Sequence, residues 1–278
     1  MPSPALQEVV ALLGCPAAGN PAQYLFERMI EAAGLDWRFV SLDVQPDGIG
    51  DAIRGAAAMG FRGCVLSGPL RAAALPVVAS ASPAATFAGA VSLVTREPAG
   101  PAGHMTDGRG VLEALRAHVD PAGARVLVVG AGAAGRAVAL ELALAQAAEI
   151  VVCSRSPERA VPLVDAVAAL GSAAAGTVPW GPSIEVPERV GIVVVAVPAT
   201  GPKPTATLTA LRPDLVVADL AVVSQPAPVV TAARQHNACV IDGLEIHCAR
   251  TAIDFHSLTG IEPDTEELRE ALDEFLSA

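Results

Sequence analysis

Three glycines in the segment GAGAAG have the spacing that can hold the pyrophosphate of a dinucleotide. Gly130 permits a tight turn after a strand, Gly132 lets the backbone approach phosphate oxygens, and Gly135 lets a helix pack closely on the strand. Free N–H groups and the helix dipole favour an anion at the start of that helix. The flanks RVLVV and EIVVC fit a strand–turn–helix–strand unit, although a purely structural glycine turn is the alternative. The predicted binding residues are Gly130, Ala131, Gly132, Ala133, Ala134 and Gly135.

The end of the second strand of this unit indicates which dinucleotide binds. NAD sites usually carry Asp or Glu there, to accept a hydrogen bond from the ribose 2′-hydroxyl. This chain has Ser154, Arg155 and Ser156 instead, with Arg159 one turn later. Guanidinium groups bind a 2′-phosphate well, and no carboxylate repels it. These residues therefore predict NADP as the cofactor, the alternative being that both arginines form a solvated helix face.

The elements that must position these residues alternate between apolar strands and helices, which predicts an α/β fold with largely parallel sheets. The glycine motif lies in the continuous unit 124–160. Helices are expected from Asn20-Pro21 to about Ala33, over Asp51–Met59, after Pro69, from about Asp107 and after Asp264. At the last of these helices, Asp264 and Glu267 form a capping pattern. The remaining expected strands are Val9–Gly14, Trp37–Val44, Arg62–Ser67, Gly89–Glu97, Gly191–Val197, Asp214–Leu220 and Ala238–Asp242. A Pro/Gly-rich stretch, 98–110, follows the expected strand Gly89–Glu97.

The nucleotide unit is bracketed by the helix near Asp107 and a turn near Asp242-Gly243. We therefore expect a substrate domain made of residues 1–107 and 243–278, and a Rossmann-type NADP-binding domain made of residues 108–242. A ligand cleft between two such domains is the expected site of chemistry.

Composition excludes several classes of function. The 278 residues are 52% hydrophobic and 17% charged, as in a folded globular protein, and the net charge of −11 argues against a nucleic-acid-binding surface. No apolar run reaches the roughly 18 residues of a membrane span, and no signal peptide is evident. The five cysteines show no metal-binding or redox spacing, which predicts mostly buried free thiols, a cytoplasmic location and no metal. We expect a monomer or homodimer.

Five segments in the same order resemble the shikimate dehydrogenase family, and together they cover nearly the whole chain. They are GFRGCVLSGPLRAAALP at 60–76, GHMTDGRG at 103–110, SRSPERA at 154–160, VVVAVPAT at 193–200 and DGLEIHCARTAIDFHSLTG at 242–260. The resemblance implies hydride transfer between NADP(H) and a hydroxyl or keto carbon of a small anionic cyclic carboxylate such as shikimate, within aromatic amino acid biosynthesis.

The resemblance also implies particular site residues. The family's proton-handling lysine falls on Arg71 and its aspartate on Asp107, which are the expected catalytic pair. Val197 and Gly243 fall in segments that line the cofactor. The positions implied for the substrate are Asn20, Ser67, Met105, Thr106 and Arg250.

Several of these positions depart from the family pattern. Arginine keeps its proton at any physiological pH, so Arg71 cannot be a general base, and the chain's single lysine, Lys203, lies in the middle segment. Asp107 is then the expected proton acceptor, directly or through water, with His247 a weaker candidate. Val65, Met105 and Val222 replace polar family residues, which predicts a more apolar pocket and a substrate with fewer hydroxyls. A slow true shikimate dehydrogenase and a non-catalytic NADP-binding sensor remain alternatives.

Overall fold

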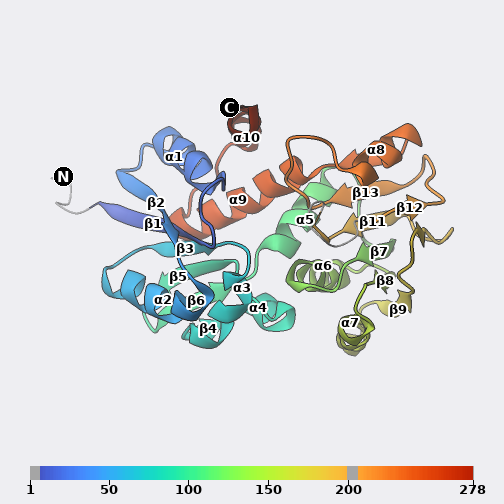
Figure 1. Ribbon diagram of the computed structural model, residues 1–278, viewed down its shortest axis with the longest axis horizontal. Helices are drawn as coiled ribbons and strands as arrows, with labels where there is room; N and C mark the ends of the chain where they lie inside the picture. The colour runs from blue at the N-terminus through green and yellow to red at the C-terminus, as the bar shows by residue number, and fades with distance from the viewer. Residues whose placement is uncertain (1–6, 199–205, 278) are drawn as a thin grey trace. The chain divides into compact units, whose positions relative to one another are not determined.

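A computed structural model describes residues 7–198 and 206–277, so Lys203 and the end of the VVVAVPAT segment lie outside the described residues. The chain divides into two compact units. The first combines Met1–Thr106 with Thr251–Ala278, and the second is Asp107–Arg250. Relative to the expected domains, the second unit also takes Asp107 and residues 243–250. Its second boundary falls within one continuous helix, α9 (Gly243–Thr259), which begins where the sequence predicted a turn (Figure 1).

The first unit is built on a six-stranded sheet in the order β2-β1-β3-β5-β6-β4. Its strands are β1 (Glu8–Gly14), β2 (Trp37–Asp43), β3 (Gly63–Leu66), β4 (Ser80–Ala81), β5 (Leu93–Glu97) and β6 (Gly100–His104). The strand β1 runs parallel to β2 and β3, whereas β5 runs antiparallel to β3 and β6. The expectation of largely parallel strands is therefore only partly right for this sheet.

The strand β6 lies inside the Pro/Gly-rich stretch 98–110, where no strand was expected from the sequence. Its backbone pairs with β5 from Glu97↔Gly100 to Leu93↔His104, so pairing with a neighbour overrides weak local strand propensity. The preceding strand starts at Leu93 rather than Gly89, because Gly89 ends the helix α4 (Pro83–Ala88) in the left-handed conformation with φ 70°.

Helices cover the sheet of the first unit, where Phe26 of one helix stacks on Phe39 at 4.6 Å between ring centroids. Asn20 Oδ1 accepts from the Ala22 N–H, and Asp264 Oδ1 accepts from the Glu266 and Glu267 N–H groups, which confirms both predicted caps. The remaining elements are α1 (Ala22–Ala32), the short helix η1 (Pro46–Gly48), α2 (Ile49–Ala58), α3 (Leu70–Ala74), the short helix η2 (Leu75–Val77) and α10 (Thr265–Ser277).

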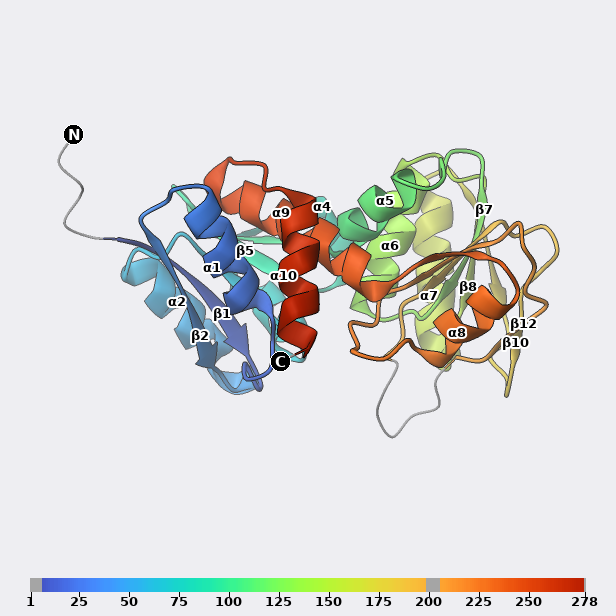
Figure 2. The same cartoon turned by 90° about the horizontal axis from the view of Figure 1, so that it is seen from above.

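The second unit contains a fully parallel six-stranded sheet in the order β14-β13-β11-β7-β8-β9. Figure 2 labels its strands β7 and β8 together with the helices α6 and α7. The order reverses between β7 and β11, which is the switch point where dinucleotides bind in doubly wound folds. The strands are β7 (Arg125–Val129), β8 (Glu149–Cys153), β9 (Ala174–Val178), β11 (Ile192–Val195), β13 (Val216–Asp219) and β14 (Cys239–Ile241). A separate two-stranded sheet pairs β10 (Ile184–Glu185) with β12 (Leu208–Thr209).

Helices α6 and α7 pack on the β7–β9 half of this sheet, and α8 packs on β13 and β14. The second-unit helices are α5 (Asp107–Arg116), α6 (Ala133–Leu144), α7 (Pro157–Ala169) and α8 (Pro228–Gln235). The predicted strand–turn–helix–strand unit is thus confirmed, whereas β9 has no apolar run and was not expected. None of the helices in the described part of the chain has the length and hydropathy to cross a membrane.

Cysteine burial follows the prediction at three of five positions. Cys64, Cys153 and Cys248 are buried and Cys15 is half-buried. Cys239 is exposed, contrary to the expectation of a buried thiol, because it begins the edge strand β14.

Candidate functional site

The glycine loop between β7 and α6 has the geometry its sequence requires. Gly130 adopts φ 121°, which L side chains rarely tolerate, and its N–H donates to the Cys153 carbonyl at 2.8 Å. A methyl group on Gly135 would lie 1.9 Å from the carbonyl oxygen of Gly130, so only glycine lets α6 start this close to the turn. Close backbone approaches therefore require glycine at both positions of this loop.

Gly132 marks the open side of the same loop. It is the residue before α6, and a Cβ built on it would meet nothing within 4 Å. No side chain caps α6, so the N–H groups of its first turn, Ala133 to Gly135, face that opening without a partner from a capping residue. An open approach in front of uncapped N–H groups fits a pyrophosphate.

The end of β8 carries the residues predicted to read a 2′-phosphate. Ser154 Oγ accepts from the Ser156 N–H at 3.2 Å, which shapes the turn into α7. The Arg155 guanidinium lies over the Trp180 ring, 5.6 Å from its centroid, and Arg159 is exposed in the first turn of α7. A guanidinium supported by an aromatic face, with no carboxylate among Ser154, Arg155 and Ser156, fits a cofactor phosphate.

Val197 and Gly243 lie near the carboxyl ends of other strands of the same sheet. Val197 follows β11 and packs, half-buried, against the core of the unit. A methyl group on Gly243 would lie 2.0 Å from the Ala221 carbonyl oxygen, so this glycine is needed where α9 begins beside the segment after β13. Their contact with a cofactor stays a prediction.

In the first unit, three predicted residues follow the parallel strands β1 and β3. Asn20 lies in the loop after β1, where its side chain caps α1. Ser67 follows β3, and its N–H donates to Leu13 at the end of β1 at 3.1 Å. Arg71 is half-buried, and its Nε donates to the Leu66 carbonyl at 2.9 Å. The guanidinium is therefore folded back over the end of β3 rather than extended into water.

A buried polar chain that the sequence did not reveal lies at the same end of the sheet. Thr106 Oγ1 donates to Asp254 Oδ1 at 2.7 Å, and it lies 3.0 Å from Ser92 Oγ. Ser92 Oγ also accepts from the Thr106 N–H at 2.9 Å, while the Ser92 carbonyl accepts from Leu66 N–H. The Asp254 carboxylate is fully buried. Residues 106 and 254 are far apart in sequence, so no local pattern indicates their contact.

Met105, also predicted to contact substrate, is 2% exposed. Its side chain is part of the apolar core in this structure, so a contact with substrate stays a prediction.

Asp107 begins α5, where a carboxylate is favoured by the helix dipole.

Asp107 and Arg250, both buried, form an ion pair within the second unit. Arg250 Nη1 lies 3.8 Å from Asp107 Oδ1. Arg250 was predicted to bind substrate, and that contact stays a prediction. His247, the weaker candidate, lies on α9 in the same unit.

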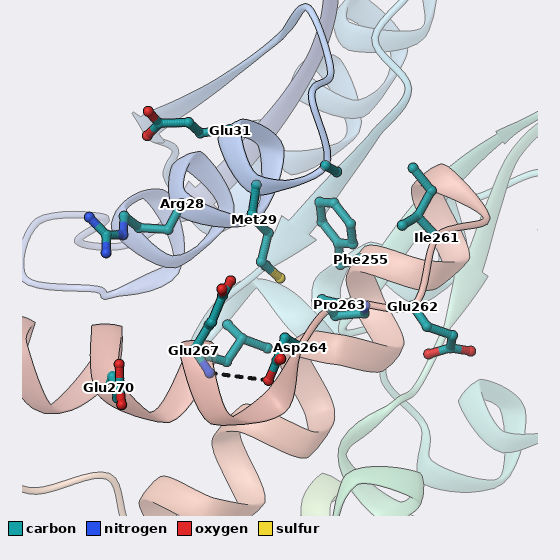
Figure 3. A pocket seen from close by; sticks show the side chains of 13 residues that line it. Arg28, Met29, Glu31, Phe255, Ile261, Glu262, Pro263, Asp264, Glu267 and Glu270 are labelled. Atoms are coloured by element: carbon teal, nitrogen blue, oxygen red, sulfur yellow. Dashed lines mark hydrogen bonds between the residues drawn. The ribbon is translucent and has the colours of Figure 1, made fainter.

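A pocket of about 590 Å³ lies in the first unit, and none of the predicted site residues lines it (Figure 3). It is bordered by α1, the end of α9 and the start of α10. Five acidic side chains and one arginine line it: Glu31, Glu262, Asp264, Glu267, Glu270 and Arg28. Such a charge balance disfavours an anionic substrate, so this pocket does not compete with the site above.

A doubly wound parallel sheet with an uncapped glycine loop at its switch point, joined to a second α/β unit, defines a nucleotide-dependent enzyme of the dehydrogenase class. Residues 12–94 match the shikimate dehydrogenase substrate binding domain, and residues 126–274 match the saccharopine dehydrogenase NADP binding domain. The chain is 31% identical to the NADP⁺ shikimate dehydrogenase of Moorella thermoacetica over 97% of this chain and 94% of that protein.

Solved structures agree with this assignment. A 5-ketofructose reductase of a Gluconobacter species superposes with a TM-score of 0.90 at 28% identity, covering 98% of this chain and 99% of that one. A shikimate dehydrogenase of Thermus thermophilus, in complex with NADP(H) and shikimate, gives 0.80 at 28% identity, covering 97% and 100%. The chain belongs to the shikimate dehydrogenase family of NADP-dependent oxidoreductases.

Proposed function

We propose that this protein transfers hydride between NADP(H) and a hydroxyl or keto carbon of a small cyclic carboxylate related to shikimate. The observation that carries the proposal is the open, uncapped glycine loop at the switch point of the second unit's parallel sheet. When bound, the nicotinamide supplies or accepts the hydride. Gly130–Gly135 would hold the pyrophosphate of the dinucleotide, and Arg155 and Arg159 would bind its 2′-phosphate.

The proton that accompanies the hydride needs an acceptor, and Asp107 takes it in our proposal. In the direction of alcohol oxidation, the Asp107 carboxylate receives the hydroxyl proton directly or through one water. Arg71 stays protonated and stabilises the negative charge that develops on the carbonyl oxygen, as an electrostatic group rather than a base. Arg250 keeps Asp107 oriented through their ion pair.

We infer the substrate class from the polar side chains at the positions where the family binds its substrate. Arg71 and Ser67 favour an anionic or carbonyl-bearing ligand beside β3, while Val65, Met105 and Val222 offer no hydrogen bonds to ring hydroxyls. A site that lacks such partners discriminates weakly in favour of a polyhydroxylated ring. We therefore infer a carboxylated ring with fewer hydroxyls than shikimate, and a part in aromatic amino acid biosynthesis then depends on efficient turnover of shikimate itself.

A second candidate substrate is an open or cyclic ketose without a carboxylate. The 5-ketofructose reductase gives the TM-score of 0.90 and spans both chains almost completely, which favours this candidate. Reduction of such a ketone needs the same NADPH geometry and the same proton route in reverse.

The test is steady-state oxidation of NADPH, followed by absorbance, with 3-dehydroshikimate, cyclohexanone carboxylates and 5-ketofructose as oxidants. The primary proposal expects the highest kcat/KM with a keto-carboxylate that has fewer hydroxyls than 3-dehydroshikimate. The highest kcat/KM with 5-ketofructose overturns the primary proposal and supports the second. No oxidation with any ketone, despite NADPH binding, would support the sensor alternative.

The variants Arg71→Lys and Asp107→Asn test separately the proposed charge stabilisation by Arg71 and the proposed proton acceptance by Asp107. Arg71→Lys is expected to raise turnover of 3-dehydroshikimate only if the chain is a slow shikimate dehydrogenase. Asp107→Asn is expected to lower kcat by at least about 100-fold with the preferred substrate, because general acid–base catalysis contributes about that much. Unchanged kcat in Asp107→Asn contradicts the proposed proton route.

A further inference from the structure

A cysteine, a histidine and a glutamate form a chain of contacts on the surface of the second unit. Cys239 Sγ lies 4.0 Å from His118 Nδ1, and His118 Nε2 lies 2.7 Å from Glu245 Oε1. The Cys239 thiol is exposed, and the side chains of His118 and Glu245 are each 33% exposed. The oxidoreductase mechanism above uses none of the three.

The polarity of these contacts suits a base that removes the thiol proton. Because the Glu245 carboxylate can only accept, the short contact places the imidazole proton on Nε2. In the neutral imidazole Nδ1 then carries the lone pair, and this nitrogen lies 4.0 Å from Cys239 Sγ. A nucleophile, a base within reach and a third group that orients the base is the arrangement found at activated nucleophiles.

The backbone holds all three residues in place. The Cys239 N–H donates to Leu215 at 2.9 Å, and the His118 N–H donates to Leu115 at 2.9 Å. The Glu245 N–H donates to Asp242 Oδ1 at 3.1 Å in the first turn of α9. The contact between thiol and imidazole is thus set by a strand, a helix end and a helix start, not by a free loop.

The other cysteines provide an internal contrast. Burial raises the pKa of Cys64 to about 12 and that of Cys153 to about 11, so both are inert at neutral pH. Cys248 is buried. Cys15 is half-buried, and its Sγ contacts Gln45 Oε1 at 3.6 Å, an amide that cannot take a proton at neutral pH.

We propose that Cys239 is a site of reversible thiolation by low-molecular-weight disulfides. His118 takes the thiol proton, and the thiolate attacks one sulfur of the disulfide. The new bond joins Cys239 Sγ to that sulfur, and the old S–S bond breaks. The other half leaves as a thiolate and takes the proton from His118, so the step needs no other oxidant.

This site is separate from the nucleotide loop within the same sheet. In register, Cys239 pairs with Val216, Val216 with Ile192, and Ile192 with Val126. Cys239 is therefore three strands from β7, roughly 14 Å across the sheet, and it is level with Val126 rather than with Gly130 beyond the end of β7. The proposal does not rest on the proposed oxidoreductase function, and Cys239→Ser is expected to leave NADPH binding unchanged.

The experiment uses the full chain with excess 2-hydroxyethyl disulfide, a neutral probe, followed by intact mass and peptide mapping. We expect Cys239 to be modified first, at least about tenfold faster than Cys15, and dithiothreitol to restore the original mass. Cys239→Ser should abolish the fast phase. Glu245→Gln and His118→Asn should slow it at least about fivefold, whereas Glu113→Gln, which removes an exposed carboxylate paired with Arg116, should not.

For each variant, the rate of Cys239 modification in the folded protein is compared with the rate in urea, where the tertiary contacts are lost. If Cys239 reacts no faster folded than unfolded, or if the Glu245→Gln and His118→Asn rates equal the wild-type rate in variants whose circular dichroism is unchanged, the proposal is overturned. Equal rates at Cys15 and Cys239 would do the same, since the contact with His118 would then give the Cys239 thiol no advantage in reactivity.

Discussion

Adding one methyl group at either of two glycines in the same loop should separate packing from cofactor binding. In Gly135→Ala the new Cβ would fall short of an ordinary contact distance from the Gly130 carbonyl oxygen, 3.4 Å, by about 1.5 Å. In Gly132→Ala the Cβ meets no protein atom within 4 Å, and φ −80° with ψ −175° is ordinary for alanine. We therefore expect Gly135→Ala to lower the stability of the fold, and Gly132→Ala to affect only the binding of a ligand.

The magnitudes differ accordingly. Overpacking of this kind costs about 1–3 kcal/mol, or roughly 2–12 °C in Tm for a unit of this size, so Gly135→Ala should unfold earlier. Gly132→Ala should change stability by less than about 1 kcal/mol, as expected for one residue before a helix. It should weaken NADPH binding at least about tenfold, or about 1.4 kcal/mol, because the methyl group occupies the space that the pyrophosphate needs.

Thermal unfolding by circular dichroism and titration of NADPH fluorescence measure the two effects independently. Wild-type affinity in a normally folded Gly132→Ala protein would show that the pyrophosphate does not lie at this loop. Wild-type Tm in Gly135→Ala would show that α6 does not start as close to the turn as the coordinates place it. Either outcome refutes the reasoning for its glycine.

Three other changes have defined outcomes. Arg155→Ala should raise the Kd for NADPH about 10- to 100-fold while leaving that for NADH unchanged, measured by fluorescence titration, because only NADPH carries the 2′-phosphate. Thr106→Val removes the hydroxyl that donates to buried Asp254 and should lower the free energy of unfolding in urea by about 1–3 kcal/mol. Burial raises the pKa of Asp219 from 3.8 to about 6, so the folded chain binds this proton more tightly than the unfolded chain. The associated stability is present below about pH 4 and is lost as pH rises to about 6, and Asp219→Asn should therefore be more stable than wild type at pH 7, by up to about 3 kcal/mol in urea titrations, but not at pH 4.

Short-range patterns account for what the sequence predicted best. The strand–loop–helix–strand unit of residues 124–160 is contiguous, so its glycine spacing and its flanks can be interpreted together. The caps at Asn20 and Asp264 are equally local, since each side chain accepts from N–H groups two or three residues away. The strand β6 was missed because it depends on pairing with β5 and not on its own residues.

The sequence by itself determined the nucleotide unit and the preference for NADP, because each depends on residue types at fixed short spacings. The resemblance of its motifs to the family further implied that Arg71 takes the place of a titratable lysine. Only the tertiary structure decided that Asp254 accepts from Thr106, and that His118 lies between Cys239 and Glu245. Those partners are more than 120 residues apart in the chain, and His118 contacts one neighbour from a strand and one from a helix. Such contacts depend on how sheets and helices pack, and packing places side chains together that no local pattern associates.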